Sequence, residues 1–137
     1  NENMPYFVMS KLQRVLNQRG KCLKGSIILV LGVTYKADIE DPRESPATKV
    51  MELLQHEGAE LQYSDPYTPS LIIQGQEYKS QQINAELLKR SACALVLTAH
   101  SAFDYQLIVD HAPVVFDTRN GTRQVKHHRD RIVLLST

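Results

Sequence analysis

The chain has 137 residues, of which 42% are hydrophobic and 23% are charged, and its formal net charge is +1. This length is typical of one domain, and the near-neutral charge excludes the strong electrostatic attraction on which non-specific nucleic-acid binding depends. No apolar run reaches the roughly 18 residues of a membrane span, and no secretory leader pattern opens the sequence. We therefore expect a cytoplasmic domain that binds neither nucleic acid nor membrane.

The two cysteines, Cys22 and Cys93, lie far apart and outside any C-x-x-C or Cys/His cluster. This spacing argues against a zinc site and against a disulfide framework. Cys93 lies in an apolar run and is expected to pack in the core, whereas Cys22 has no neighbouring base that would make it a nucleophile. We expect two reduced thiols, no metal ion and no catalytic cysteine.

The first half of the chain predicts helices and strands in alternation. Apolar residues at helical spacing predict an N-terminal helix over roughly residues 5–18. An unbroken apolar run at Ile27–Val33 predicts a central parallel strand that is covered on both faces. The polar segment Thr34–Pro46 contains two prolines, so we expect a functional loop of about a dozen residues. The apolar stripe of Ala47–Leu54 predicts a second helix.

The second half repeats this alternation with shorter elements. A short strand over Leu61–Tyr63 is followed by an irregular excursion marked by Pro69 and Gly75. The later elements are a helix at Asn84–Arg90, a strand at Ala92–Thr98, a helix at Asp104–His111, and strands at Val114–Asp117 and Arg131–Leu135. This order predicts an α/β fold with a doubly wound, mostly parallel, Rossmann-like or flavodoxin-like sheet of about five strands, preceded by an N-terminal helix.

Ligands of such sheets bind beyond the carboxyl ends of the strands, where the strand order reverses. The polar residues that follow the expected strands are therefore the candidates for a site: Thr34, Tyr35, Lys36, Asp38, Asp41, Arg43, Ser45, Asp65, Tyr67, Thr98, His100, Asp117, Arg119 and Asn120. Three of them, Lys36, Arg43 and Arg119, are cations. Arg offers a planar fork for phosphate oxygens and Lys a point charge, so this edge predicts a pocket for a phosphate-bearing small molecule.

Other interpretations of these residues remain open. Asp41 and Arg43 are equally consistent with a surface loop in which they pair with each other or cap the helix that follows. Arg119 is also consistent with a solvated loop position. Asp38 and Asp41 resemble paired carboxylates for acid–base catalysis, but the cations on the same loop make that interpretation weaker.

Two further patterns limit the chemistry. His100 is more consistent with a surface or packing position than with a metal ligand, since no carboxylate or cysteine stands at ligand spacing. A dinucleotide fingerprint needs G-x-G-x-x-G directly after the first strand, and residues 32–36 read GVTYK instead. The chain therefore lacks a complete NAD site of its own.

Four ordered motifs run through the chain: LGVTYK at 31–36, DPRESP at 41–46, GA followed by YSDP within 58–66, and DTRN at 117–120. Together they resemble the C-terminal domain of the UDP-glucose/GDP-mannose dehydrogenase family, and the resemblance covers nearly the whole chain. The residues around these motifs, including TAH at 98–100, are similar to those of the branch that oxidises UDP-N-acetylhexosamines such as UDP-N-acetylglucosamine.

Members of this family combine an N-terminal Rossmann domain that binds NAD, a central helical dimerisation region and a C-terminal domain that closes over the UDP-sugar. The resemblance implies that residues 1–25 are a lead-in helix from the central region and that residues 26–137 are the UDP-sugar-binding α/β domain. It also implies a homo-oligomer that oxidises the C6 alcohol to a uronic acid for surface polysaccharides. Two hydride transfers to NAD carry out this oxidation, with a thioester on a catalytic cysteine between them.

By the same resemblance, Tyr35, Lys36 and Arg119 contact the UDP-sugar, and Arg43 reaches the NAD cofactor. The family's catalytic cysteine follows a Gly-Phe-Gly-Gly run that this chain does not contain, so the resemblance implies a fragment that binds without turnover. Pro42 departs from the small or β-branched residue that is usual at its position, so we expect the loop that carries Arg43 to be stiffer than is typical of the family.

Two other classes of function remain as alternatives. One is a stand-alone nucleotide-sugar-binding or regulatory module without redox activity. The other is a receiver-like signalling domain in which Asp38 and Asp41 form an acidic pocket. The second alternative lacks an aspartate directly at the end of the first strand, and Lys36 and Arg43 would oppose a divalent cation there.

Overall fold

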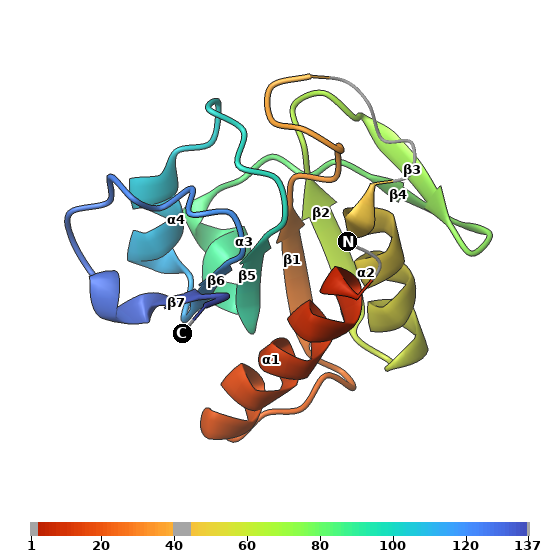
Figure 1. Ribbon diagram of the computed structural model, residues 1–137, viewed down its shortest axis with the longest axis horizontal. Helices are drawn as coiled ribbons and strands as arrows, with labels where there is room; N and C mark the ends of the chain where they lie inside the picture. Colours follow the sequence, from red (N-terminus) through yellow and green to blue (C-terminus); the bar gives the residue numbers. More distant parts are fainter. Residues whose placement is uncertain (1–2, 40–44, 137) are drawn as a thin grey trace.

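The computed structural model describes residues 3–39 and 45–136 (Figure 1). Its helices are α1 (Met4–Gln18), α2 (Pro46–His56), α3 (Ala85–Arg90), α4 (Tyr105–His111) and a short 3-10 helix (Arg129–Arg131). Its strands are β1 (Ile27–Leu31), β2 (Glu60–Ser64), β3 (Ser70–Ile73), β4 (Gln76–Lys79), β5 (Cys93–Val96), β6 (Val115–Asp117) and β7 (Ile132–Leu134).

Five strands form one parallel sheet in the order β2-β1-β5-β6-β7. Leu29 of β1 pairs with Gln62 on one side and with Ala94 on the other, so β1 lies inside the sheet. The strand order reverses between β1 and β5, because the chain adds β2 outside β1 and then returns to place β5 on the other side. Helices α1 and α2 cover one face, and α3 and α4 cover the other (Figure 1). The expected doubly wound α/β fold is confirmed.

The core has one layer on each side of the sheet, because successive side chains of a strand point to opposite faces. Ile28 and Val30 pack with α1 and α2, whereas Leu29 and Leu31 pack with α3 and α4, and all four are fully buried. Leu12 of α1 is also fully buried in the first layer. The N-terminal helix therefore supports the sheet directly, while the proposed division of the chain near residue 25 remains a prediction.

The strand boundaries differ slightly from the sequence pattern. β1 ends at Leu31 rather than at Val33, because Gly32 adopts a φ of 85° and turns the chain out of the sheet. β7 is preceded by the 3-10 helix and begins at Ile132. Such shifts occur where a single residue changes the backbone direction without interrupting the apolar pattern.

The segment around Pro69 and Gly75 was expected to be irregular, and that expectation was wrong. β3 and β4 form an antiparallel hairpin outside the main sheet, with Gln74 and Gly75 at its turn. Both turn residues have positive φ, 49° and 80°, as a type I′ turn requires. The hairpin is tied to α2 through Gln55, whose Nε2 donates to the carbonyl oxygen of Ile73 at 3.0 Å.

Candidate functional site

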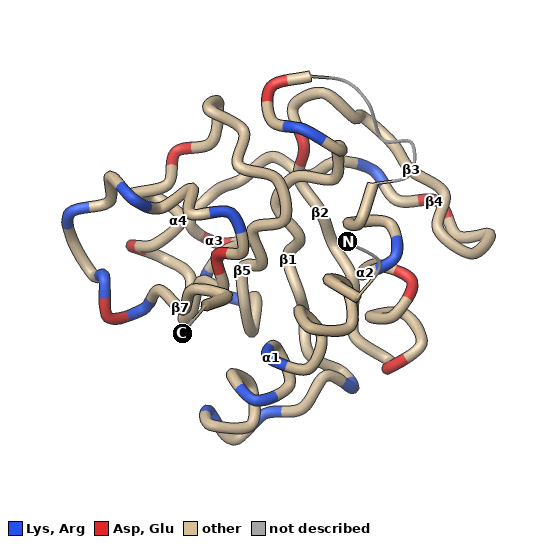
Figure 2. Tube along the Cα trace, in the orientation of Figure 1, with Lys and Arg blue, Asp and Glu red and all other residues tan. Residues whose placement is uncertain are grey.

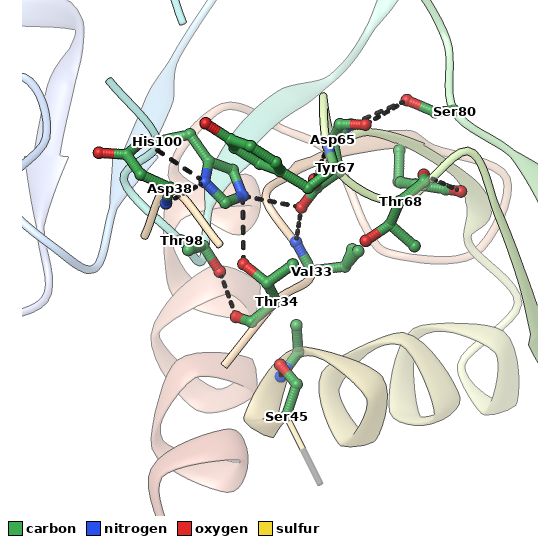
Figure 3. Close-up of polar contacts among 12 residues, drawn as sticks. Val33, Thr34, Asp38, Ser45, Asp65, Tyr67, Thr68, Ser80, Thr98 and His100 are labelled. Carbon is green, nitrogen blue, oxygen red and sulfur yellow. Dashed lines mark hydrogen bonds and ion pairs between the residues drawn. The ribbon is translucent and has the colours of Figure 1, made fainter. Parts of the chain in front are cut away.

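The loops after β1 and β5 meet at the point where the strand order reverses (Figure 3). The hydroxyl of Thr98 donates a hydrogen bond of 2.7 Å to the carbonyl oxygen of Thr34, which joins the two loops directly. In open α/β sheets a ligand crevice forms at this reversal. Here buried polar groups of the protein join the two loops, and the exposed candidates lie around them.

Asp65 follows β2 and is only 2% exposed. Its carboxylate accepts hydrogen bonds from the backbone N–H groups of Val33 and Tyr67, both at 2.7 Å, and from Nε2 of His100 at 2.9 Å. A buried carboxylate requires such donors, since an unpaired buried charge is strongly unfavourable. The Val33 amide is one of the first amides after β1, where a dinucleotide-binding sheet presents its amides to a pyrophosphate.

His100 follows β5 and is fully buried. Its Nδ1 accepts a hydrogen bond of 2.8 Å from the backbone N–H of Asp38, so the ring proton must lie on Nε2. Nε2 then faces Asp65 Oδ2 and also lies 3.2 Å from Thr34 Oγ1. The sequence pattern offered a surface or packing position for this histidine and missed its hydrogen bonds. The available signal was that His100 and Asp65 follow strands on either side of β1.

Tyr35 and Lys36 lie on the outer surface of the loop after β1. Tyr35 is 51% exposed, and Lys36 is exposed as well. Beneath them, the hydroxyl of Thr34 donates to the carbonyl oxygen of Lys36 at 2.7 Å. The backbone of the loop is therefore held while its two candidate side chains face solvent.

Arg119 lies on the loop after β6, and Asp117 organises this loop. Asp117 is 1% exposed and accepts backbone hydrogen bonds from Arg119 and Gly121, both at 3.1 Å, and from Thr122 at 2.8 Å. It also accepts a bond of 2.6 Å from the Thr122 hydroxyl. Arg119 itself is exposed and lines a cleft of about 750 Å³ that includes Phe7 of α1.

This cleft combines a cation with an apolar surface. Phe7 is 64% exposed, and Leu134 and Leu135 line the same cleft. A guanidinium beside an exposed aromatic ring suits a ligand with an anionic part and a flat part, such as a nucleotide. Tyr35 and Lys36 do not line this cleft.

Many of the basic residues of the described chain lie in two segments. Figure 2 shows Lys and Arg along α1 with the turn that follows it, and along the long segment between β6 and β7. Most acidic residues lie in other parts of the chain, and Asp130 lies inside the second segment. Arg119 belongs to the second of these segments, at the end where it leaves the carboxyl edge of the sheet.

Arg43, the predicted cofactor contact, lies outside the described residues, and so does Asp41. Their predicted pairing and their predicted roles remain predictions. The helix that follows them begins at Pro46 and has Ser45 as its N-cap, since Ser45 Oγ accepts from the backbone N–H of Ala47 at 3.1 Å.

A second cleft, of about 560 Å³, lies between the loops after β1, β5 and β6 and includes Asp38, Tyr105 and Arg123. The Tyr105 hydroxyl donates to the carbonyl oxygen of His100 at 2.8 Å. Burial, assisted by the charges of Asp117 and Asp38, raises the pKa of Tyr105. This tyrosine is therefore a fixed hydrogen-bond donor that supports the loop carrying His100.

Cys93 is buried, and burial raises the pKa of its thiol to about 12, which confirms the expected packing role. Cys22 is exposed. Within residues 3–39 and 45–136, no group of three or more His, Cys, Asp or Glu residues is arranged to hold a metal ion. The helices in the same ranges are too short or too polar to cross a membrane.

Comparison with known proteins identifies relatives of the chain. Residues 29–124 match the sequence model of the UDP-glucose/GDP-mannose dehydrogenase family, UDP binding domain. The chain is 34% identical over 128 residues to a UDP-N-acetyl-D-mannosamine dehydrogenase of Methanococcus maripaludis, in a match that covers 88% of this chain and 28% of that protein. It is 29% identical over 132 residues to a UDP-glucose 6-dehydrogenase of Rickettsia bellii, covering 88% and 29%.

The same likeness extends to solved structures. A UDP-N-acetyl-mannosamine dehydrogenase from Staphylococcus aureus aligns with a TM-score of 0.76 and 26% identity over 98% of this chain and 31% of that chain. A UDP-D-ManNAc dehydrogenase from Pyrococcus horikoshii shares the fold, with a TM-score of 0.74 and 23% identity over 98% and 30%. The chain thus spans 28% to 29% of the two relatives compared by sequence. It belongs to the UDP-glucose/GDP-mannose dehydrogenase family and matches that family's UDP binding domain.

Proposed function

We propose that this chain is the UDP-sugar-binding domain of an NAD-dependent UDP-sugar 6-dehydrogenase. Lys36 and Arg119 neutralise the diphosphate, and Tyr35 contacts the same substrate. The observation that carries the proposal is that buried groups hold both loops at the carboxyl edge of the sheet while these side chains stay exposed. A guanidinium fork and an ammonium point charge together suit the oxygens of a diphosphate.

The names of the relatives favour a UDP-N-acetylhexosamine as the substrate of the whole enzyme. The reaction is the oxidation of the C6 alcohol to a carboxylate, and NAD supplies the hydride acceptor when it is bound. The residues of this chain bind and orient the nucleotide, while the catalytic cysteine belongs to a part of the enzyme outside this sequence. We also infer that the enzyme is a cytoplasmic homo-oligomer, as the family resemblance implies.

The described residues do not fit a dinucleotide site. The Val33 amide already donates a hydrogen bond of 2.7 Å to the carboxylate of Asp65. The backbone of Thr98 lies against Gly32, at the place where a pyrophosphate would need space. We therefore assign the NAD contacts to Arg43 and mainly to the N-terminal domain of the full-length enzyme. In this assignment Arg43 reaches across an interdomain cleft.

Calorimetric titration of the chain with UDP, and separately with NAD, tests the proposal. We expect UDP binding that weakens about tenfold in Lys36→Ala and in Arg119→Ala, since each substitution removes a charged hydrogen-bond donor. Lys21→Ala is a matched control, because Lys21 is exposed and precedes β1 at the opposite edge of the sheet. UDP affinity that is unchanged in both test variants would refute the assignment of these residues to the substrate. Tight NAD binding by the chain alone would refute the assignment of the NAD site mainly to the N-terminal domain.

A further inference from the structure

The residues on either side of Tyr35 and Lys36 in the loop after β1 both contact the buried imidazole ring of His100. At one end, Thr34 Oγ1 lies 3.2 Å from Nε2 of His100. At the other end, the backbone N–H of Asp38 donates to Nδ1 at 2.8 Å (Figure 3). The two candidate substrate-binding residues lie between these attachment points along the chain, so the ring holds the backbone on both sides of them.

The direction of each hydrogen bond follows from the donors available. A backbone N–H can only donate, so Nδ1 of His100 carries no proton and Nε2 carries it. The Thr34 hydroxyl gives its own proton to the carbonyl oxygen of Lys36 at 2.7 Å and therefore presents a lone pair to Nε2. Nε2 shares its proton between this lone pair and Oδ2 of Asp65 at 2.9 Å. Every polar atom of the ring and of the Thr34 side chain is thus committed to holding the loop.

The ring is held in place by its neighbours. The ring centroids of Tyr67 and Phe103 lie 5.0 and 5.5 Å from that of His100. Among the residues that the structure describes, the charged groups that face the ring are the carboxylates of Asp65 and Asp38, and Oδ1 of Asp38 lies 3.9 Å from Nδ1. That same Oδ1 accepts from the backbone N–H of Ser101 at 2.7 Å, which fixes Asp38 to the loop after β5.

The burial of His100 excludes direct contact with a substrate. The ring is fully buried and both nitrogens are used within the protein, so it has no atom to offer to a ligand. Any effect of this histidine on binding must pass through the loop that it supports. Asp38 has a φ of 63°, a left-handed conformation that is unfavourable for a non-glycine residue and needs tertiary contacts to persist.

We propose that His100 is a positioning residue for the UDP-sugar, and that its Nδ1 contact with the Asp38 amide sets the place of Tyr35 and Lys36. Asp65 acts behind it by fixing the ring and its tautomer. This inference rests on the proposed function for the role of Lys36, whereas the contacts themselves are independent of it. The site is therefore a two-layer arrangement, with exposed ligand-binding side chains above and a buried His–Asp pair below.

Two conservative substitutions of His100 test the contributions of Nδ1 and Nε2 separately. The amide of Gln reaches the place of Nε2 and retains a partner for Asp65, but it leaves the Asp38 amide without its acceptor. The amide of Asn reaches the place of Nδ1 and retains that acceptor. We expect His100→Gln to weaken UDP binding about tenfold and His100→Asn to weaken it about threefold or less. His128→Gln is the matched control, because His128 Nδ1 forms a 2.9 Å pair with Asp110 on the exposed surface.

A double-mutant cycle distinguishes positioning from general stabilisation. If His100 acts through Lys36, His100→Gln adds little to the loss already caused by Lys36→Ala. A second measurement needs no substitution: nitrogen NMR of the wild-type chain should show the Nε2–H tautomer of His100 and slow hydrogen exchange at the Asp38 amide. This measurement keeps the inference testable even if the His100 variants fail to fold.

The possible outcomes separate the two proposals. UDP binding that depends on Lys36 but falls equally in His100→Gln and His100→Asn, or a His100→Gln effect that multiplies fully with Lys36→Ala, would overturn the positioning role alone. An unprotected Asp38 amide would also overturn it. A folded wild-type chain that binds no UDP would overturn the proposed function of the chain, and the positioning of a UDP-sugar with it.

Discussion

A Cβ atom added to Gly32 would lie 2.4 Å from the carbonyl oxygen of Thr98 and 2.5 Å from its Cβ. Gly32 also has a φ of 85°, so the position combines a left-handed backbone with a close approach of two chain segments. This approach brings the Thr98 hydroxyl within hydrogen-bonding distance of the Thr34 carbonyl. The geometry of the whole site therefore depends on the absence of a side chain at residue 32.

Substitution of Gly32 by Ala should destabilise the chain strongly. The new methyl group would collide with backbone atoms that cannot move aside, and the left-handed φ would add strain, so we expect a loss of about 3 kcal/mol in the free energy of unfolding. Urea denaturation followed by circular dichroism measures this loss. Gly20→Ala is the control, since Gly20 has a φ of 73° with nothing within 4 Å, and its cost should be about 1 kcal/mol. Equal costs at the two positions would contradict the close approach.

The main elements of the fold could be predicted because their patterns are local. Ile27–Leu31 is a continuous apolar run, as a strand covered on both faces must be. The β3–β4 hairpin could not be recognised in the same way. Its turn is Gln74-Gly75 rather than Asn-Gly, and Gln is an unusual residue at positive φ. Hydrogen bonds to α2 hold the hairpin: Gln74 donates to Glu52 at 2.9 Å, and Gln55 donates to the hydroxyl of Tyr78 at 2.8 Å.

The rule that ligands bind beyond the carboxyl ends of parallel strands predicted which residues lie at the site, but it did not predict their roles. Asp65, His100 and Asp117 were all expected at the carboxyl edge, and all three lie there. Each of the three is buried and organises a loop instead of facing a ligand. This role depends on long-range contacts, such as the one between His100 and Asp38, which are 62 residues apart. A pattern of residue types shows where strands end. It does not show which polar side chains turn inward.

The two thiols should differ sharply in reactivity. Burial raises the pKa of the Cys93 thiol to about 12, so this residue remains a protonated, inaccessible thiol at pH 8. Iodoacetamide should therefore add one carbamidomethyl group to the native chain, at the exposed Cys22, and two to the chain in urea. Mass spectrometry counts the adducts. In Cys22→Ser the native chain should gain none, and rapid double labelling of the native wild type would show that β5 is not packed as described.

Alkaline pH should destabilise the fold through Tyr63. Burial, and then the nearby charge of Asp65, raises the pKa of this phenol from 10.0 to about 12. The unfolded chain loses the proton first, so the stabilising contribution is complete below pH 10 and is lost as the pH rises from 10 to 12. Urea unfolding at pH 8 and at pH 11 measures the loss.

The Tyr63→Phe variant provides the control for this pH dependence. It removes the ionisable hydroxyl together with its 2.8 Å hydrogen bond to the Thr68 carbonyl, so we expect lower stability at pH 8 and a smaller further loss at pH 11. An identical loss between the two pH values in both proteins would assign the alkaline sensitivity to other groups.

The last prediction concerns Asp117, whose carboxylate accepts hydrogen bonds from the Arg119 loop. Asp117→Asn replaces one acceptor oxygen with an NH2 group, which would face the amide donors of Gly121 or Thr122. We expect a loss of about 2 kcal/mol in the free energy of unfolding, since a buried donor is left without an acceptor. We also expect weaker UDP binding, because Arg119 loses its fixed place in the cleft.

Asp104→Asn is the matched control for this substitution. Asp104 caps α4 and accepts one bond from the backbone N–H of Leu107 at 3.1 Å, a role that Asn fills equally well. Asp104→Asn should therefore change neither stability nor UDP affinity. If Asp117→Asn destabilises the chain and the remaining folded protein binds UDP with wild-type affinity, Asp117 does not set the place of Arg119 for binding, and this positioning role must be abandoned.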